Sequence, residues 1–185
     1  MTPDFDTRLK SIISAMENIV IPSIASDDSM SLQQAGLIVR HIAIMRQQLP
    51  YLQVFESLCV HDMEQLARQI LVSPSIGSLL GPPADLQAAL AADNLTAQER
   101  YIAIGRAVEE VINAAQSMPE ALLLEEIAGP VLEFSERQTM RERVWFAGTG
   151  FDPHAESLPS ISSLFRSGSF AMRGREYEQE AAISD

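Results

Sequence analysis

Apolar residues recur at alternating steps of three and four along most of the first 146 residues. Five runs show this spacing, over residues 5–19, 35–49, 52–70, 101–115 and 124–134. The spacing matches the period of an α-helix, and no segment alternates apolar and polar residues as a half-buried strand does. We therefore predict an all-α fold: an up-and-down helical bundle of four to five main helices with an extended C-terminal arm.

Capping residues and prolines indicate where these helices begin and end. We expect Thr2 to cap the first helix, which ends near Pro22. Ser31 with Gln34 has the spacing of a capping box and predicts the start of the second helix, and Pro50 separates it from the third.

Three further boundaries follow from the same signals. The segment SPSIGSLLGPP, residues 73–83, is expected to prevent a regular element, and a short helix is predicted over 83–92. Thr96 with Glu99, and Ser117 with Glu120, predict the starts of the last two long helices. Gly129-Pro130 is expected to kink the final helix or split it in two. Leu124 is among the residues of this helix that we expect to face the core.

The second helix has apolar residues on two sides. We assign one stripe to the core: Ala35, Ile38, Ile42, Met45 and Leu49. Leu37 and Ile44 fall on the opposite side, so this helix is either central in the bundle or half-buried against a partner.

The composition changes at Gly148, after which Gly, Ser and Pro are frequent. We predict a helical bundle domain over 1–147 and a Ser/Gly-rich arm over 148–185. The arm keeps enough apolar residues to lie across the bundle or across a second subunit, and an aromatic cluster precedes it. The candidate interaction surface is therefore Leu37, Ile44, Trp145, Phe146, Phe151, Leu164, Phe165 and Phe170.

The charge of the chain excludes several classes of partner. The sequence has 25 acidic and 13 basic residues, a net charge of −12. Such a chain does not favour binding to nucleic acid or to an anionic membrane surface. No run approaches the ~20 apolar residues of a membrane span, no secretory signal is visible, and the lone Cys59 cannot form an internal disulfide. We expect a cytoplasmic protein.

The stretch LCVHDMEQ, residues 58–65, gathers side chains that could bind metal or carry protons. On a helix, Cys59 lies on the apolar stripe, while His61 and Asp62 point in other directions. Glu64 and Arg68 have the spacing of a surface ion pair. We interpret this stretch as a structural helix with its acids facing water.

Other polar groups fit no catalytic pattern. Neither His41 nor His61 follows a glutamate by three residues, as the di-iron carboxylate motif requires. Asp152, His154 and Ser157 are close in sequence, but no strand–turn–helix nucleophile elbow surrounds a serine. We predict no catalytic, metal or cofactor-binding residue and no cofactor.

The stretch RLKSIISAMENIVIPSI…SMSLQQAGLIVRHIAIMRQQ, residues 8–48, resembles a group of uncharacterised bacterial helical-bundle proteins. In that group a short amphipathic helix ends in a proline and a second helix begins at a polar turn. The resemblance implies a helical fold and no particular activity.

Three functions are compatible with the sequence. The first is a non-catalytic helical protein that associates with a protein partner or with itself, a homo-oligomer with a dimer favoured. The second is a binder of a small apolar or acyl ligand in space opened by Gly105, Gly129 and Pro130. The third is a metal-dependent enzyme that uses His41 or His61 with helix carboxylates. We expect the first.

Overall fold

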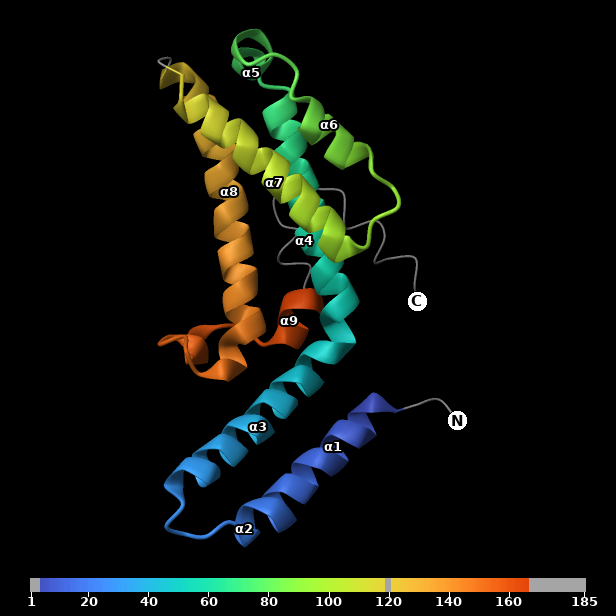
Figure 1. Cartoon of the computed structure of the whole chain (residues 1–185), viewed down its shortest axis with the longest axis vertical. Coiled ribbons are helices and arrows are strands. Elements are labelled where there is room, and N and C mark those ends of the chain that lie inside the picture. Colours follow the sequence, from blue (N-terminus) through green and yellow to red (C-terminus); the bar gives the residue numbers. More distant parts are fainter. Residues whose placement is uncertain (1–3, 119–120, 167–185) are drawn as a thin grey trace. The chain divides into compact units, whose positions relative to one another are not determined.

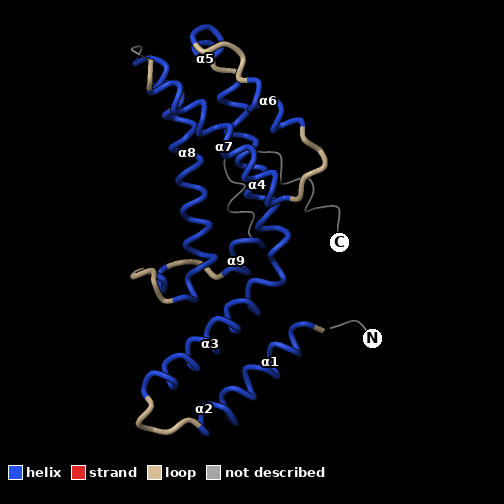
Figure 2. Tube along the Cα trace, in the orientation of Figure 1, coloured by secondary structure: helices blue, strands red, loops and turns tan. Residues whose placement is uncertain are grey.

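The protein is described here by a computed structural model that covers residues 4–118 and 121–166 (Figure 1). Figure 2 shows helices and loops and no strand within these residues. The prediction of an all-α fold is confirmed. Five helices of eleven or more residues are described: α1 (Phe5–Ala15), α3 (Ser29–Gln48), α4 (Leu52–Leu71), α7 (Ala97–Gln116) and α8 (Ala121–Phe146).

Shorter helical segments connect and follow the long helices. They are the π-helix η1 (Met16–Val20), α2 (Ile21–Ser23), the 3-10 turn η2 (Leu49–Tyr51), α5 (Pro74–Leu79), α6 (Ala84–Ala91), the 3-10 turns η3 (Ala147–Thr149) and η4 (Ala155–Ser157), and α9 (Ile161–Arg166). The extended arm predicted from residue 148 thus contains helical turns in its described part.

The contacts within the chain divide it into two compact units. Unit 1 comprises residues 1–52 and 141–185, and unit 2 comprises residues 53–140. The predicted division into a domain of 1–147 and an arm of 148–185 stays a prediction, because residues 167–185 lie outside the described part of the chain.

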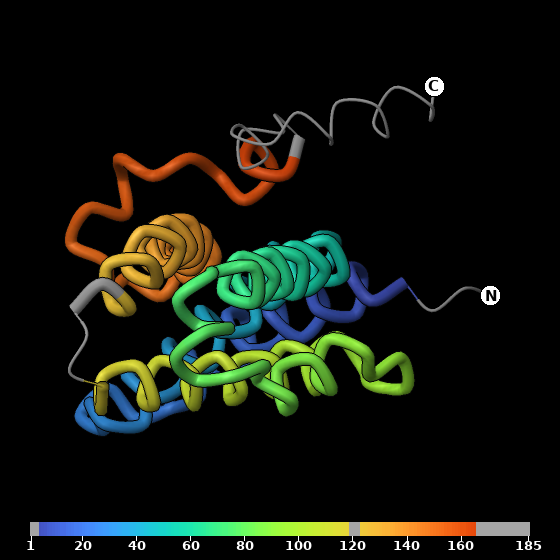
Figure 3. The backbone as a smooth tube through the Cα atoms, turned by 90° about the horizontal axis from the view of Figure 1, so that it is seen from above, coloured from blue at the N-terminus to red at the C-terminus, as the bar shows by residue number. Residues whose placement is uncertain are grey.

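Unit 2 has an apolar core to which α4, α5, α6, α7 and α8 all contribute. Figure 3 shows the backbone of these helices from above. The predicted stripe of α4 is buried at Cys59, Met63, Leu66 and Ile70. The other helices contribute Ile76, Leu86, Ile104, Ala107, Val108, Val111, Ala115, Leu123 and Ile127. Burial of these side chains is the main favourable term that holds the unit together.

The segment 73–83 is not irregular, contrary to the prediction. Ser73 caps α5 by accepting a hydrogen bond from the N–H of Ile76, and Pro74 occupies the first turn, where its missing N–H has no cost. Ile76 is fully buried in the core. Gly81 then takes a positive φ of 77°, which ends this region. The Ser and Pro residues therefore start a short helix here, and burial of Ile76 stabilises it.

The predicted capping box of α7 is confirmed. The N–H of Glu99 donates to Oγ1 of Thr96, and the Glu99 carboxylate accepts from the Thr96 N–H at 2.9 Å. The Thr96 hydroxyl also donates to this carboxylate, and the hydrogen bonds from the N–H and then the hydroxyl of Thr96 lower the pKa of the Glu99 carboxyl. The Ser117–Glu120 box cannot be compared, because Glu120 lies outside the described residues.

Helix α8 is not split at Gly129-Pro130, and it differs from the prediction in one inward candidate. Leu124, predicted to face inward, is exposed, whereas its neighbour Leu123 is fully buried. A shift of one residue turns a helix face by about 100°, so a stripe with few apolar anchors is easily assigned one position off.

In unit 1, α1 and α3 lie side by side and run in opposite directions as a helical hairpin (Figure 1). Asp4 caps α1 by accepting from the N–H of Thr7, and the predicted cap Thr2 lies outside the described residues. Asp28 caps α3 by accepting from the N–H of Ser31 at 3.0 Å. The predicted capping box that begins at Ser31 is therefore wrong, because an aspartate three residues earlier provides the acceptor.

Candidate interaction surface

Asp6 joins the two helices of the hairpin. Its carboxylate accepts from Nε of Arg46 on α3 at 2.5 Å and pairs with Nζ of Lys10 on α1 at 2.6 Å. Hydrogen bonds from Lys10 and then Arg46 lower the pKa of Asp6. This cluster marks the side on which α1 and α3 meet.

The hairpin buries little apolar surface. No residue of α1 is buried, and in α3 only Ala35 and Ile44 are. Most of the stripe assigned to the core of the second helix is exposed or half-buried, with Ile38 at 48 % and Met45 at 49 % exposure. The predicted assignment is thus wrong for Ile38, Met45 and Leu49, which are exposed. It holds for Ala35, which is buried, and Ile44 on the opposite side is buried as well.

Five half-exposed apolar side chains lie on one face of the hairpin. Successive residues of a helix are turned by about 100° around its axis. Seen along α1, Phe5 and Ile12 therefore lie roughly a quarter to a third of a turn from Asp6, against the direction in which the chain winds. The two on α3, and Leu49 at the start of η2, lie about a sixth to a quarter of a turn before Arg46. Asp6 and Arg46 point toward each other and the two helices are antiparallel. Equal rotations of the same sense, away from Asp6 on one helix and from Arg46 on the other, therefore place the apolar side chains on the same side of the hairpin. We call this set the hairpin face: Phe5, Ile12, Ile38, Met45 and Leu49.

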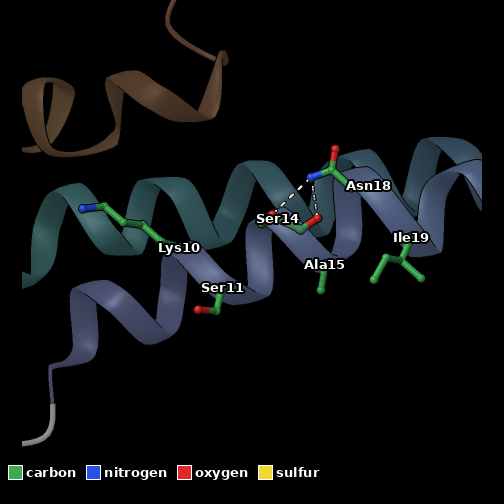
Figure 4. Close-up of a pocket in the computed structure, with 6 residues that line it drawn as sticks. All are labelled: Lys10, Ser11, Ser14, Ala15, Asn18 and Ile19. Carbon is green, nitrogen blue, oxygen red and sulfur yellow. Dashed lines mark hydrogen bonds between the residues drawn. The ribbon is translucent and has the colours of Figure 1, made fainter.

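A shallow depression of about 470 Å³ lies on another side of α1 (Figure 4). Its lining residues are Lys10, Ser11, Ser14, Ala15, Asn18 and Ile19. The Asn18 side chain donates to the carbonyl and the hydroxyl of Ser14, at 2.8 and 3.1 Å. These amide and hydroxyl groups thus satisfy one another, and no charged or catalytic set converges on the depression.

Aromatic rings from three segments meet at the other end of unit 1. The Phe165 ring of α9 stacks on Tyr51 with a centroid distance of 5.6 Å and meets Trp145 edge-on at 6.2 Å. Nε2 of Gln48 donates to the carbonyl of Trp145 at 2.8 Å. The C-terminal segment therefore packs on its own unit through Phe165, in agreement with the expectation that part of it lies across the helices.

The loop after α8 is held at both ends. A Cβ added to Gly148 would lie 2.9 Å from Cγ1 of Ile44, so only glycine allows this approach to α3 without a shift. Nε of Arg143 donates to the Asp152 carboxylate at 2.7 Å, and the N–H of His154 donates to it at 2.8 Å. Both contacts lower the pKa of Asp152, with Arg143 the larger cause.

The candidate interaction residues do not form one surface. Ile44, Trp145 and Leu164 are buried, and Leu37 and Phe165 are half-buried. Phe146 and Phe151 are exposed, the latter by 87 %. Phe170 lies outside the described residues. The structure therefore brings Trp145 and Phe165 together as packing groups. It leaves Phe146 exposed at the end of α8 and Phe151 exposed on the loop that follows.

Within unit 2, the stretch LCVHDMEQ contributes to packing and to three ion pairs. Cys59 is buried, as predicted. Asp62 is also buried, contrary to the prediction that it faces water, and its Oδ2 lies 3.7 Å from Nε of Arg137 on α8. The predicted pair of Glu64 with Arg68 is confirmed at 3.5 Å.

Glu64 has a second and closer partner that the sequence did not indicate. Nε of Arg100 on α7 donates to its Oε1 at 2.6 Å. The same guanidinium donates to the carbonyl of Leu90 at 2.9 Å and to that of Ala92, at the end of α6. Arg100 thus links α4, α6 and α7.

The polar groups considered for chemistry do not converge in the part of the chain that the structure describes. His41 and His61 are exposed, and no group of three His, Cys, Asp or Glu side chains is placed to hold a metal ion there. Asp152 is held by Arg143, and the Ser157 hydroxyl donates to the carbonyl of His154 at 2.8 Å instead of contacting the imidazole. Among the described helices, none is long and apolar enough to cross a membrane.

The glycines behind the ligand-binding hypothesis do not open a described space in unit 2. A Cβ at Gly105 would make ordinary contact with Cε of Met63 at 3.5 Å. Gly129 is exposed on the surface of α8. The ligand hypothesis stays a prediction without a structural feature behind it.

The hairpin face is not predicted from the sequence, because Ile38, Met45 and Leu49 are assigned to the core there. An available signal was that both neighbouring helices, 5–19 and 35–49, carry complete stripes at steps of three and four. Two such helices that pair only with each other cannot bury both stripes, so one face of the pair is left open.

Comparisons with protein-family models, curated proteins and solved structures find no match to this chain.

Proposed function

We propose that the chain is a non-catalytic helical protein that acts by associating with a protein, either a partner or another copy of itself. The observation that supports the proposal is the hairpin face, a set of apolar side chains on two helices of which one contains no buried residue. Helices of this length gain most of their stability from packing an amphipathic face. A hairpin that leaves this face in water is therefore suited to cover it with another protein.

The free energy available from this face is substantial. Complete burial of a large apolar side chain stabilises by about 1.5–3 kcal/mol, so a half-exposed one has about 1 kcal/mol left to gain. Five such side chains correspond to about 5 kcal/mol per hairpin, and an apolar partner surface gains a similar amount. The sum approaches the cost of association, about 4–15 kcal/mol, before any polar contact is counted.

The test compares the full chain with a variant that carries Ile12→Glu and Ile38→Glu. Both positions are about half-exposed, so the single chain should tolerate the carboxylates. The matched control, Ile102→Glu with Leu132→Glu, places the same charge on exposed positions of unit 2.

The proposal expects association that the hairpin variant loses and the control keeps. Light scattering measures self-association, and affinity capture from an extract of the native host measures binding to other proteins. The proposal is contradicted if the wild-type chain is monomeric and if the wild type, the hairpin variant and the control all capture the same proteins.

A further inference from the structure

We propose that the hairpin face is covered by the hairpin face of a second copy of this chain, so that two hairpins form a four-helix bundle. This inference rests on the proposed function and names the partner for it. The residues concerned are the five of the hairpin face, all of them within unit 1.

The spacing of the apolar residues favours helix-on-helix packing. On α1 and η1 the apolar residues at this spacing are Phe5, Leu9, Ile12, Met16 and Ile19. On α3 and the first residue of η2 they are Ala35, Ile38, Ile42, Met45 and Leu49. Regular alternation of three and four is the pattern of four-helix bundles and coiled coils, in which each helix presents a narrow seam to its neighbours. A flat or irregular partner does not require this regularity.

A copy of the hairpin supplies a partner of matching length and direction. Residues 5–23 and Ser29–Gln48 each form about 19–20 residues of helix, or about 30 Å. A two-fold axis in the plane of the contact places each helix of one hairpin against an antiparallel helix of the other. Such an interface is isologous, so the same patch is used twice.

The distribution of charge permits this contact. Residues 1–52 contain five acidic and four basic residues, a net charge of −1. The whole chain has a net charge of −12, so the remaining 133 residues carry −11. Electrostatic repulsion between two copies is therefore weakest when their hairpins meet. None of the five residues of the hairpin face is charged.

The apolar area also fits a dimer. A half-exposed side chain of this size has about 100 Å² of surface, which gives about 500 Å² for the five residues. A standard interface takes about 800 Å² from each partner, of which a little over half is apolar. The hairpin face therefore holds about the apolar area that one copy contributes to a stable dimer.

The experiment uses charge complementation in the full chain. One variant carries Ile12→Glu and Ile38→Glu, and a second carries Ile12→Lys and Ile38→Lys. Sedimentation equilibrium measures the dissociation constant of the wild-type chain, of each variant alone, of their equimolar mixture, and of the Ile102→Glu, Leu132→Glu control. Far-UV circular dichroism verifies that each variant keeps its helix content.

We expect a wild-type dimer, and a dissociation constant at least about 100-fold higher for each variant alone, because a two-fold contact brings four like charges together. The mixture should recover a dimer, since each hairpin then meets one of opposite charge. Recovery requires that this face meets its own copy, and a variant that merely unfolds does not recover.

Three results overturn the inference, and they separate it from the proposed function. If the wild-type chain is a dimer and both the Glu and the Lys variant remain dimeric, the chain self-associates through another surface. The inference is then wrong, and the proposed function stands. Monomeric variants that do not pair on mixing show that the face meets a different surface. A monomeric wild-type chain excludes the dimer, and the proposed function then depends on capture of another protein through the hairpin.

Discussion

Replacement of Arg100 by methionine tests the best-defined polar interaction of unit 2. The substitution keeps an apolar stem and removes the guanidinium, which donates to Glu64 and to the carbonyls of Leu90 and Ala92. Arg100 is 18 % exposed and Glu64 is 21 % exposed, so solvent screens this pair only in part. In the variant, the carbonyls at the end of α6 lose their donor, and Glu64 keeps only the more distant Arg68.

The expected loss of stability is about 3 kcal/mol. A hydrogen bond to a charged group contributes about 1.5–3 kcal/mol, but three bonds made by one side chain do not add fully, and water can reach part of the site. Arg68→Met is the matched control, because Arg68 pairs with the same glutamate but is 65 % exposed. An exposed pair of this kind contributes less than about 1 kcal/mol.

Urea unfolding followed by far-UV circular dichroism measures both changes. We expect Arg100→Met to lower the midpoint without a change in slope, and Arg68→Met to shift it little. Equal effects of the two substitutions, or a loss below about 0.5 kcal/mol for Arg100→Met, would refute the reasoning that Arg100 ties three helices together.

Two further predictions concern an acid-dependent contact and a close approach. Hydrogen bonds from Ser73 and then Ser75 lower the pKa of Glu126, so its contribution to stability is complete above about pH 5 and is lost as the pH falls through the lowered value. Urea midpoints between pH 3 and 7 should therefore show that Glu126→Gln is less stable than the wild type near neutrality and equal to it in acid; a constant difference contradicts this. Gly148→Ala forces Ile44 to move and should destabilise unit 1 by about 1–2 kcal/mol, seen as an earlier transition in the fluorescence of the single Trp145. An unchanged transition means that Ile44 adjusts without cost.

The sequence predicts helix boundaries and buried residues best where a pattern of residues is compatible with one structure only. The α4 stripe is confirmed from Cys59 to Ile70, while Leu52 at its start is exposed. The capping box of α7 is confirmed, because a paired Thr and Glu at this spacing leave little choice. Periodicity reports that a face is apolar but not what covers it. The stripe of α3 was therefore assigned to the core, although its residues Ile38 and Met45 are half-exposed.

The remaining differences have local causes that depend on tertiary structure. The position of Asp62 off the apolar stripe predicts that it faces water, but the fold buries it with its Oδ2 3.7 Å from Nε of Arg137 on α8. The helix at 74–79 depends on burial of Ile76, which cannot be derived from its Ser- and Pro-rich neighbours. Of the candidate surface, Trp145 and Phe165 are far apart in the sequence, and only the fold shows that their rings meet edge-on.

The position of Lys10 makes the hairpin accessible to selective chemistry. It is the single lysine of this sequence, and its ammonium is half-exposed on α1 beside Asp6. An amine-reactive fluorophore or a cleavable cross-linker therefore modifies one side chain, in addition to the terminal amine. The hairpin can thus carry a spectroscopic label without any substitution, and a lysine-specific protease has one cleavage point, within α1.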